Sequence, residues 1–306
     1  MGRPVRHLVP DGCYFVTARC FQARLLLRPS ARTNEAVGGV LARAVRQHGV
    51  ELFAFVFASN HLHLLVRAPE ANLPRFMQYL LANVAKKVGQ LVGWRGSLWE
   101  RRYSVEPVLD DNALIGRLRY ILSHGVKEGL VRRCADWPGL SCLGQLIGDA
   151  VRRFRWFDWT QRWKSESLRR SHRDPFDPRW AVPVDLELKP LPCWADRPIP
   201  ERRMLVGELI ASIERDGSLL GAAVLGVKRV LRQRPQRRPA HVERSTRPLC
   251  HSSTREARDH YRAVYLSFVA VFREASKRWR SGQVTVAFPA YAIRPFLWPR
   301  PHAIAA

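Results

Sequence analysis

The sequence has few of the features that direct a chain to a membrane or to an oxidising compartment. Its six cysteines form no C-x-x-C pair and no zinc-finger spacing, which predicts free thiols in a reducing environment. No apolar run reaches the ~18–20 residues of a membrane-spanning helix. The first residues, Met1 to Arg6, are not followed by the apolar region of a signal peptide. We therefore expect a cytoplasmic protein with no membrane partner.

Acidic residues are scarce as well. The chain has 51 Lys and Arg residues but 26 Asp and Glu residues, a formal net charge of +25. Such an excess indicates a polyanionic partner, most commonly nucleic acid. A solvated basic surface and the arginine bias of a GC-rich genome are the alternative explanations. With 306 residues, the chain is long enough for one sizeable core and a second, small domain.

The most informative motif is an apolar run that contains two histidines, Asn60-His61-Leu62-His63-Leu64-Leu65-Val66. Its β-branched, leucine-rich composition and its apolar flanks predict a strand. Because side chains alternate between the two faces of a strand, His61 and His63 point the same way. Two neutral imidazoles on one face form half of a divalent-metal site. The alternative is a pair of half-buried sheet histidines satisfied by hydrogen bonds.

A second motif predicts a helix that carries a tyrosine and a histidine. Asp110-Asp111-Asn112 can cap a helix start, and apolar residues recur at helical spacing as far as Gly125. Tyr120 and His124 are four residues apart, so they lie on one face of this helix. A phenol beside an imidazole, presented to the two strand histidines, is a candidate nucleophile-plus-metal site. An ordinary half-buried tyrosine and a histidine that favours the helix dipole are the alternative.

The predicted elements of the first half define a fold class. Their order, β-α-β-β-α-β-α, favours an α+β fold of the ferredoxin-like type, an antiparallel sheet with helices packed on one face. The strands are predicted at 12–21, 52–57, 61–67 and 97–108, and the helices at about 30–48, 73–92 and 110–124.

The composition changes after about residue 150. Residues 151–200 are first rich in Arg and Trp and then rich in Pro, which predicts an irregular linker. Within them, the stretch 152–159 is typical of single-strand nucleic-acid binders, or else packs its tryptophans onto the first domain. Residues 201–306 read as a basic, mostly helical extension of unknown role. Its predicted helices at 201–233, divided near Asp216-Gly217, are compatible with a helix-turn-helix or with a plain helical hairpin.

With these motifs in place, the chain resembles a known family. It is similar to the single-tyrosine transposases of the His-hydrophobic-His endonuclease superfamily, especially the REP-associated tyrosine transposase-like branch. The resemblance covers roughly residues 5–145 and implies that residues 1–150 form a catalytic transposase domain. It rests on the runs 60–66, 98–103 and 120–131, followed by Trp137-Pro138-Gly139-Leu140-Ser141.

The resemblance implies a role for each matching residue. His61 and His63 correspond to two metal ligands, and Tyr120 corresponds to the nucleophile. The third-ligand position, usually Asn or Gln, holds His124 here, an imidazole that suits Mn²⁺ better than Mg²⁺. The implied reaction is cleavage of single-stranded DNA with hairpin ends through a 5′-phosphotyrosine, followed by rejoining without ATP. A homodimer in which the Tyr120 helix serves the partner's metal site is compatible with this reading.

Basic residues near these motifs are candidate phosphate contacts, although for any single one the sequence favours a solvated surface. They are Lys86, Lys87, Arg101, Arg102, Arg117 and Arg119. Two other functions stay open at this point. One is a replication initiator or relaxase that nicks a defined origin. The other is a DNA-binding protein that has lost turnover, which His124 and the absence of the family's proline at Gly125 favour.

Overall fold

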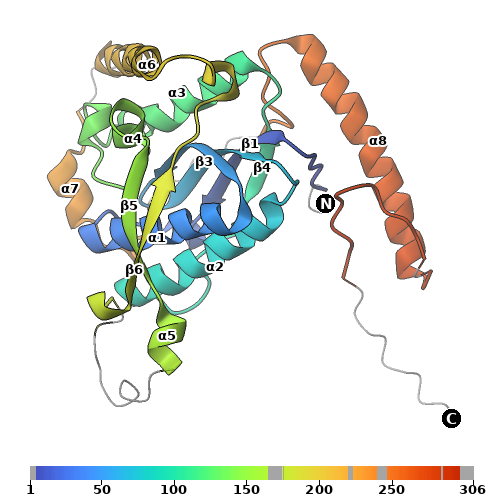
Figure 1. Ribbon diagram of the computed structural model, residues 1–306, viewed down its shortest axis with the longest axis horizontal. Helices are drawn as coiled ribbons and strands as arrows, with labels where there is room; N and C mark the ends of the chain where they lie inside the picture. The colour runs from blue at the N-terminus through green and yellow to red at the C-terminus, as the bar shows by residue number, and fades with distance from the viewer. Residues whose placement is uncertain are drawn as a thin grey trace.

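The computed structural model describes residues 5–164, 174, 176–219, 223–239, 247–283 and 285–296, and it is built around a four-stranded antiparallel sheet (Figure 1). The strands β1 (Gly12–Arg19), β2 (Glu51–Phe57), β3 (His61–Ala68) and β4 (Ser104–Pro107) lie in the order β2-β3-β1-β4. Helix α1 (Ala31–His48) joins β1 to β2, and α2 (Leu73–Val92) joins β3 to β4. This arrangement confirms the predicted ferredoxin-like α+β fold.

Helices cover both faces of the sheet. Helices α1 and α2 lie on one side, as predicted, whereas α3 (Asp111–Lys127) lies on the other side and contacts β2 and β3 (Figure 1). The reason is that the strands are apolar on both faces. Leu64 and Leu65 are adjacent in β3 and point in opposite directions, yet both are fully buried. A second layer of helix is therefore needed over the face that carries the histidines.

The fourth strand is shorter than predicted. Of the predicted residues 97–108, Ser104–Pro107 form β4, and Trp99 makes an isolated bridge with Cys20. Before β4, the Trp99 indole donates to the carbonyl of Leu81, and the Tyr103 ring lies under the guanidinium of Arg6. These local contacts replace further strand pairing.

Part of the predicted linker is a second sheet. Strands β5 (Val151–Phe157) and β6 (Ala181–Glu187) pair antiparallel and lie against α1 (Figure 1). The expectation of an irregular linker is therefore corrected for these segments. Phe154 and Trp156 lie two residues apart in β5, so they point the same way, and both are buried. The three arginines of this strand are exposed. Trp156 thus packs onto the first domain, one of the two roles considered for residues 152–159.

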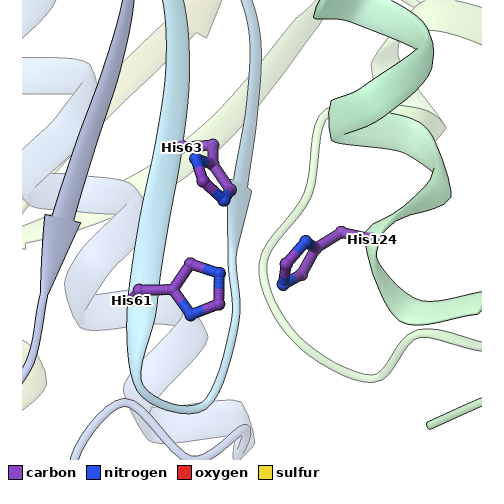
Figure 2. A group of neighbouring side chains, drawn as sticks. All are labelled: His61, His63 and His124. Atoms are coloured by element: carbon purple, nitrogen blue, oxygen red, sulfur yellow. The ribbon is translucent and has the colours of Figure 1, made fainter. Parts of the chain in front are cut away.

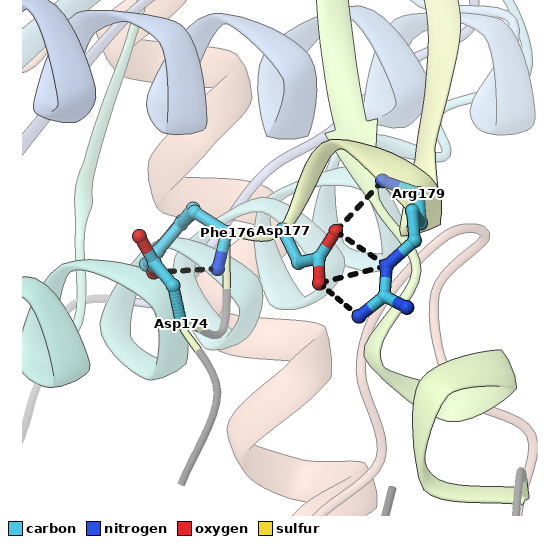
Figure 3. A network of polar contacts seen from close by, with 4 residues as sticks. All are labelled: Asp174, Phe176, Asp177 and Arg179. Atoms are coloured by element: carbon cyan, nitrogen blue, oxygen red, sulfur yellow. Dashed lines mark hydrogen bonds and ion pairs between the residues drawn. The ribbon is translucent and has the colours of Figure 1, made fainter. Parts of the chain in front are cut away.

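The chain enters β6 through a turn held by its own carboxylates (Figure 3). Asp174 accepts a hydrogen bond from the backbone N–H of Phe176. Asp177 accepts from the backbone N–H of Arg179 and also from its guanidinium, with Oδ2 2.6 Å from one terminal nitrogen. Arg32 of α1 pairs with Asp174, which ties this turn to the main domain.

Helix α1 contacts β5 so closely that there is no room for a side chain at Gly39. A Cβ atom on Gly39 would lie 2.2 Å from the carbonyl oxygen of Arg155. We expect Gly39→Ala to lower the free energy of unfolding by about 1–3 kcal/mol, because the backbone of β5 must move to relieve the overlap. Urea unfolding followed by circular dichroism measures this change.

A matched control is Gly207→Ala in α6 (Ile199–Leu219), where a Cβ atom meets no neighbour within 4 Å. This change should stabilise the protein by up to ~1 kcal/mol through helix propensity. Equal effects of the two substitutions would show that α1 and β5 are not packed as described.

The C-terminal region begins as a layer on α3. Helix α6 packs along α3 and runs unbroken through Asp216 and Gly217, so the predicted division at this point is wrong. Contacts with α3 hold this part of α6 in place. Asp216 pairs with Arg119, and Gly217 packs so closely on α3 that a Cβ atom there would lie 2.4 Å from Val126 Cγ1. The second predicted helix, 221–233, is reduced to α7 (Val227–Arg232), and residues 220–222 lie outside the described residues.

The remaining helices are α4 (Leu143–Ile147), α5 (Trp159–Lys164) and the long α8 (Arg255–Arg280). Helix α8 lies at the periphery next to the N-terminal segment, where the Tyr265 hydroxyl donates to the Val5 carbonyl (Figure 1). Among the described residues, no helix combines the length and the apolar character needed to cross a membrane.

Candidate metal centre and nucleophile

Three histidines from two elements point toward one another (Figure 2). His61 and His63 come from β3, and His124 comes from α3 on the covered face of the sheet. The possible ligand nitrogens of the three rings lie within 4.8 Å of one another. The ring centroids are 4.8, 4.6 and 5.2 Å apart. The structure therefore brings together all three residues that the sequence suggested as ligands.

The hydrogen bonds of these rings leave three buried ring nitrogens without a partner. Asn60 Oδ1 lies 2.6 Å from Nδ1 of His61, and Thr17 Oγ1 lies 2.8 Å from Nδ1 of His63. Nε2 of His63 and both ring nitrogens of His124 are buried without a hydrogen-bond partner. Buried polar atoms without a partner cost free energy, and a divalent ion would satisfy one nitrogen from each ring. The donor set therefore fits a metal ion.

The histidines are neutral in this environment. Burial lowers the pKa of His61 and His63 well below the usual value, and neighbouring imidazoles and Arg19 lower it further. Burial also lowers the pKa of His124, to about 4, with a smaller contribution from Lys127. A neutral imidazole keeps the lone pair that a metal needs, so no proton has to be displaced on binding at pH 7.

Tyr120 lies beside this cluster, one turn before His124 on α3. Its ring centroid is 5.3 Å from that of His63 and 6.3 Å from that of His124. Partial burial raises the pKa of the phenol. The phenol is therefore protonated near pH 7, and it must lose its proton when it acts as a nucleophile.

Two cations flank the Tyr120 ring. The Arg117 guanidinium is 5.2 Å and the Lys127 ammonium is 4.6 Å from the ring centroid. Lys127 was not a sequence candidate, although its position seven residues after Tyr120 puts it on the same helix face. Arg19 was also missed. It lies opposite His61 in the β1–β3 ladder, which only the strand register reveals.

The other predicted phosphate contacts lie in different surroundings. Lys86, Arg101 and Arg102 are exposed, so their role in DNA binding stays a prediction. Arg119 faces α6 rather than the histidines, with its guanidinium 2.5 Å from Asp216 Oδ2.

The structure contradicts the predicted phosphate contact of Lys87, because a buried ammonium cannot reach a phosphate group. Only 3% of this residue is exposed. Its ammonium donates to the Phe157 carbonyl at 2.6 Å and lies 4.3 Å from the ring centroids of both Trp156 and Trp159. Lys86 and Lys87 are adjacent, and adjacent residues point about 100° apart on a helix, so one faces solvent and the other faces the core.

The segment that carries the three histidines and Tyr120 is similar to known proteins. Residues 23–124 match the family model of the IS200-like transposases. The matched segment contains α1, β2, β3, α2 and β4, and it ends at His124. This match over residues 23–124 agrees with the resemblance predicted from the sequence. No curated protein matches the chain.

Two solved structures are similar to parts of the chain. One is a REP-associated tyrosine transposase bound to a REP hairpin, with 19% identity over 48% of this chain and 86% of that chain, and a TM-score of 0.41. The other is a protein from Deinococcus radiodurans R1 described as a candidate transposase, with 21% identity over 40% of this chain and 94% of that chain, and a TM-score of 0.29.

Proposed function

We propose that the protein is a metal-dependent strand transferase that cleaves and rejoins single-stranded, hairpin-containing DNA through a 5′-phosphotyrosine. One observation carries this proposal. Tyr120 lies beside a cluster of three imidazoles, two of which are buried and carry ring nitrogens without a hydrogen-bond partner, inside the segment that matches the transposases. A nucleophile next to a charge-neutralising centre is what cleavage of a phosphodiester requires.

In the proposed reaction, the Tyr120 oxygen attacks phosphorus and the P–O3′ bond breaks. The electron pair of that bond leaves on the 3′ oxygen, which takes up a proton, while the phenol proton passes to solvent. His61, His63 and His124 would hold the divalent ion, whose charge neutralises the non-bridging oxygens. Arg117 and Lys127 add positive charge next to the reacting phenol. The phosphotyrosine keeps the ester, so another 3′-OH can rejoin the strand without ATP.

The ligand set bears on the choice of metal. Imidazole nitrogen suits Mn²⁺, whereas Mg²⁺ prefers oxygen ligands and keeps several waters. With three imidazoles and no carboxylate in the cluster, Mn²⁺ is the preferred ion of this proposal, and Mg²⁺ is the second ion to test.

The test is covalent capture of DNA. Purified protein is incubated with single-stranded hairpin oligonucleotides from the regions flanking its own gene, with Mn²⁺ or Mg²⁺, and is separated on a denaturing gel. We expect a metal-dependent protein–DNA band that decreases at least about a thousandfold in Tyr120→Phe, because the nucleophile is removed. Tyr79→Phe is the matched control, since Tyr79 lies on α2 and accepts a hydrogen bond from Arg43 away from the histidines.

Each of the other possible results would indicate a different function for this protein. A band of equal strength in Tyr120→Phe would exclude Tyr120 as the nucleophile. A shifted but never covalent complex with both metals would indicate a DNA-binding protein whose catalytic site has decayed. Nicking at one defined origin without strand transfer would indicate a replication initiator or relaxase.

A further inference from the structure

A segment from the C-terminal region is attached to the edge of the catalytic sheet. The backbone N–H of His251 donates to the Pro107 carbonyl at 2.8 Å, and the N–H of Leu109 donates to the His251 carbonyl at 2.9 Å. His251 and Val108 form a parallel bridge next to β4. Residues far beyond the matched segment 23–124 therefore extend the sheet on the side where β4 would otherwise be an open edge.

The side chain of His251 also contacts the sheet, through Glu106 of β4. Its Nε2 lies 2.9 Å from Oε2 of Glu106, and the two side chains are 12% and 9% exposed. Glu106 is paired with Phe15 of β1, on the same face as His63. A buried carboxylate and imidazole are expensive to desolvate, and apolar residues of similar volume would often be as stable. The pair therefore links the C-terminal segment to the face of the sheet that carries the candidate site.

Phe15 connects this pair to the candidate metal centre. Its ring is stacked on His63, with centroids 5.0 Å apart and planes at 17°. It meets Tyr120 edge-on at 5.7 Å and His251 edge-on at 5.6 Å. One aromatic ring therefore touches a candidate ligand, the candidate nucleophile and the C-terminal histidine.

A second, independent link joins the same segment to the helix of the nucleophile. Asp110 caps α3 by accepting from the Ala113 N–H with one carboxylate oxygen. Its other oxygen accepts from the Ser253 N–H at 2.8 Å. The segment 250–254 thus contacts both the start of α3 and the ring that packs against Tyr120.

We propose that this segment completes the catalytic site, and that His251, held by Glu106, is a positioning residue that fixes Phe15 and through it Tyr120 and His63. The effect on rate rests on the proposed function, whereas the effect on the Tyr120 ring does not. Reacting atoms must be aligned at near-contact distance, and a displacement of ~1 Å lowers the rate by ~100-fold. The C-terminal region is therefore part of the catalytic unit.

The kinetic test compares His251→Ala and Glu106→Gln with His260→Ala, an exposed histidine of α8. Single-turnover formation of the covalent adduct is measured at saturating Mn²⁺ over a range of DNA concentrations. We expect His251→Ala to slow the maximal rate by about 10–100-fold, with the half-saturating DNA concentration changed less than about twofold. Glu106→Gln should lose less, because an amide oxygen still accepts from the imidazole, and His260→Ala should match the wild type.

The second measurement does not depend on turnover. The full chain is labelled with 3-fluorotyrosine, the Tyr120 resonance is assigned by its loss in Tyr120→Phe, and ¹⁹F spectra of the folded variants are compared. His251→Ala should shift or broaden the Tyr120 resonance and leave that of Tyr79 unchanged. An unchanged Tyr120 resonance, or an unchanged maximal rate in an active protein, would overturn the proposal. If the wild type forms no adduct, the proposed function fails, and the ¹⁹F spectra alone decide this inference.

Discussion

Replacing His63 with alanine is expected to abolish Mn²⁺ binding at the three-histidine cluster and, with it, covalent cleavage of DNA. His63 contacts His61, His124 and Tyr120, with its ring centroid 5.3 Å from that of Tyr120. Two imidazoles hold a divalent ion far more weakly than three, and loss of a group that hydrogen-bonds to a ligand typically lowers the affinity by about 10–100-fold. We therefore expect the Mn²⁺ dissociation constant to rise by at least about 100-fold. Electron paramagnetic resonance of free Mn²⁺ measures it directly.

One control and one further variant complete the Mn²⁺-binding test. His260→Ala removes an exposed imidazole and should leave Mn²⁺ binding unchanged. His124→Gln restores the amide that the related transposases have at this position, and it should move the preference toward Mg²⁺, because an amide oxygen replaces a nitrogen ligand. Full Mn²⁺ affinity in His63→Ala would mean that the histidines are ordinary buried residues of the sheet.

The stability of the protein should depend on pH through Lys87, with a change of about 3 kcal/mol. Burial lowers the pKa of Lys87 to about 8 in the folded protein, whereas an unfolded lysine titrates near ~10.4. Between these values the unfolded chain binds more protons, so the free energy of unfolding rises with pH. The penalty is complete below about pH 8 and disappears by about pH 10.4.

The measurement is the difference in unfolding free energy between the wild type and Lys87→Met across this range. Taking the difference removes the titration of groups that the two proteins share. The wild type should gain about 3 kcal/mol relative to Lys87→Met as the pH rises from about 7 to 11. Lys86→Met changes the exposed neighbour and should give a flat difference. A flat curve for Lys87→Met as well would show that Lys87 keeps an ordinary pKa in the folded state.

Regular periodicity made much of the site predictable. The alternation of β3 places His61 and His63 on one face whatever packs against them. The spacing of α3 does the same for Tyr120 and His124. The β5 strand alternates only over Phe154, Arg155 and Trp156, and the many prolines that follow it favour a linker. The prolines were misleading because a two-stranded sheet such as β5–β6 can tolerate a residue that donates no hydrogen bond.

What the sequence determined by itself is local: the main helices and strands of the first half of the chain, the shared face of each pair of site residues and the family resemblance of the segment 23–124. Local steric and hydrogen-bond rules set these features, and they act over a few residues. Only the tertiary structure decided that α3 covers the histidine face, that Lys87 is buried between two tryptophans and that His251 reaches Glu106. These contacts join residues far apart in the chain, and they depend on which apolar surfaces bury one another.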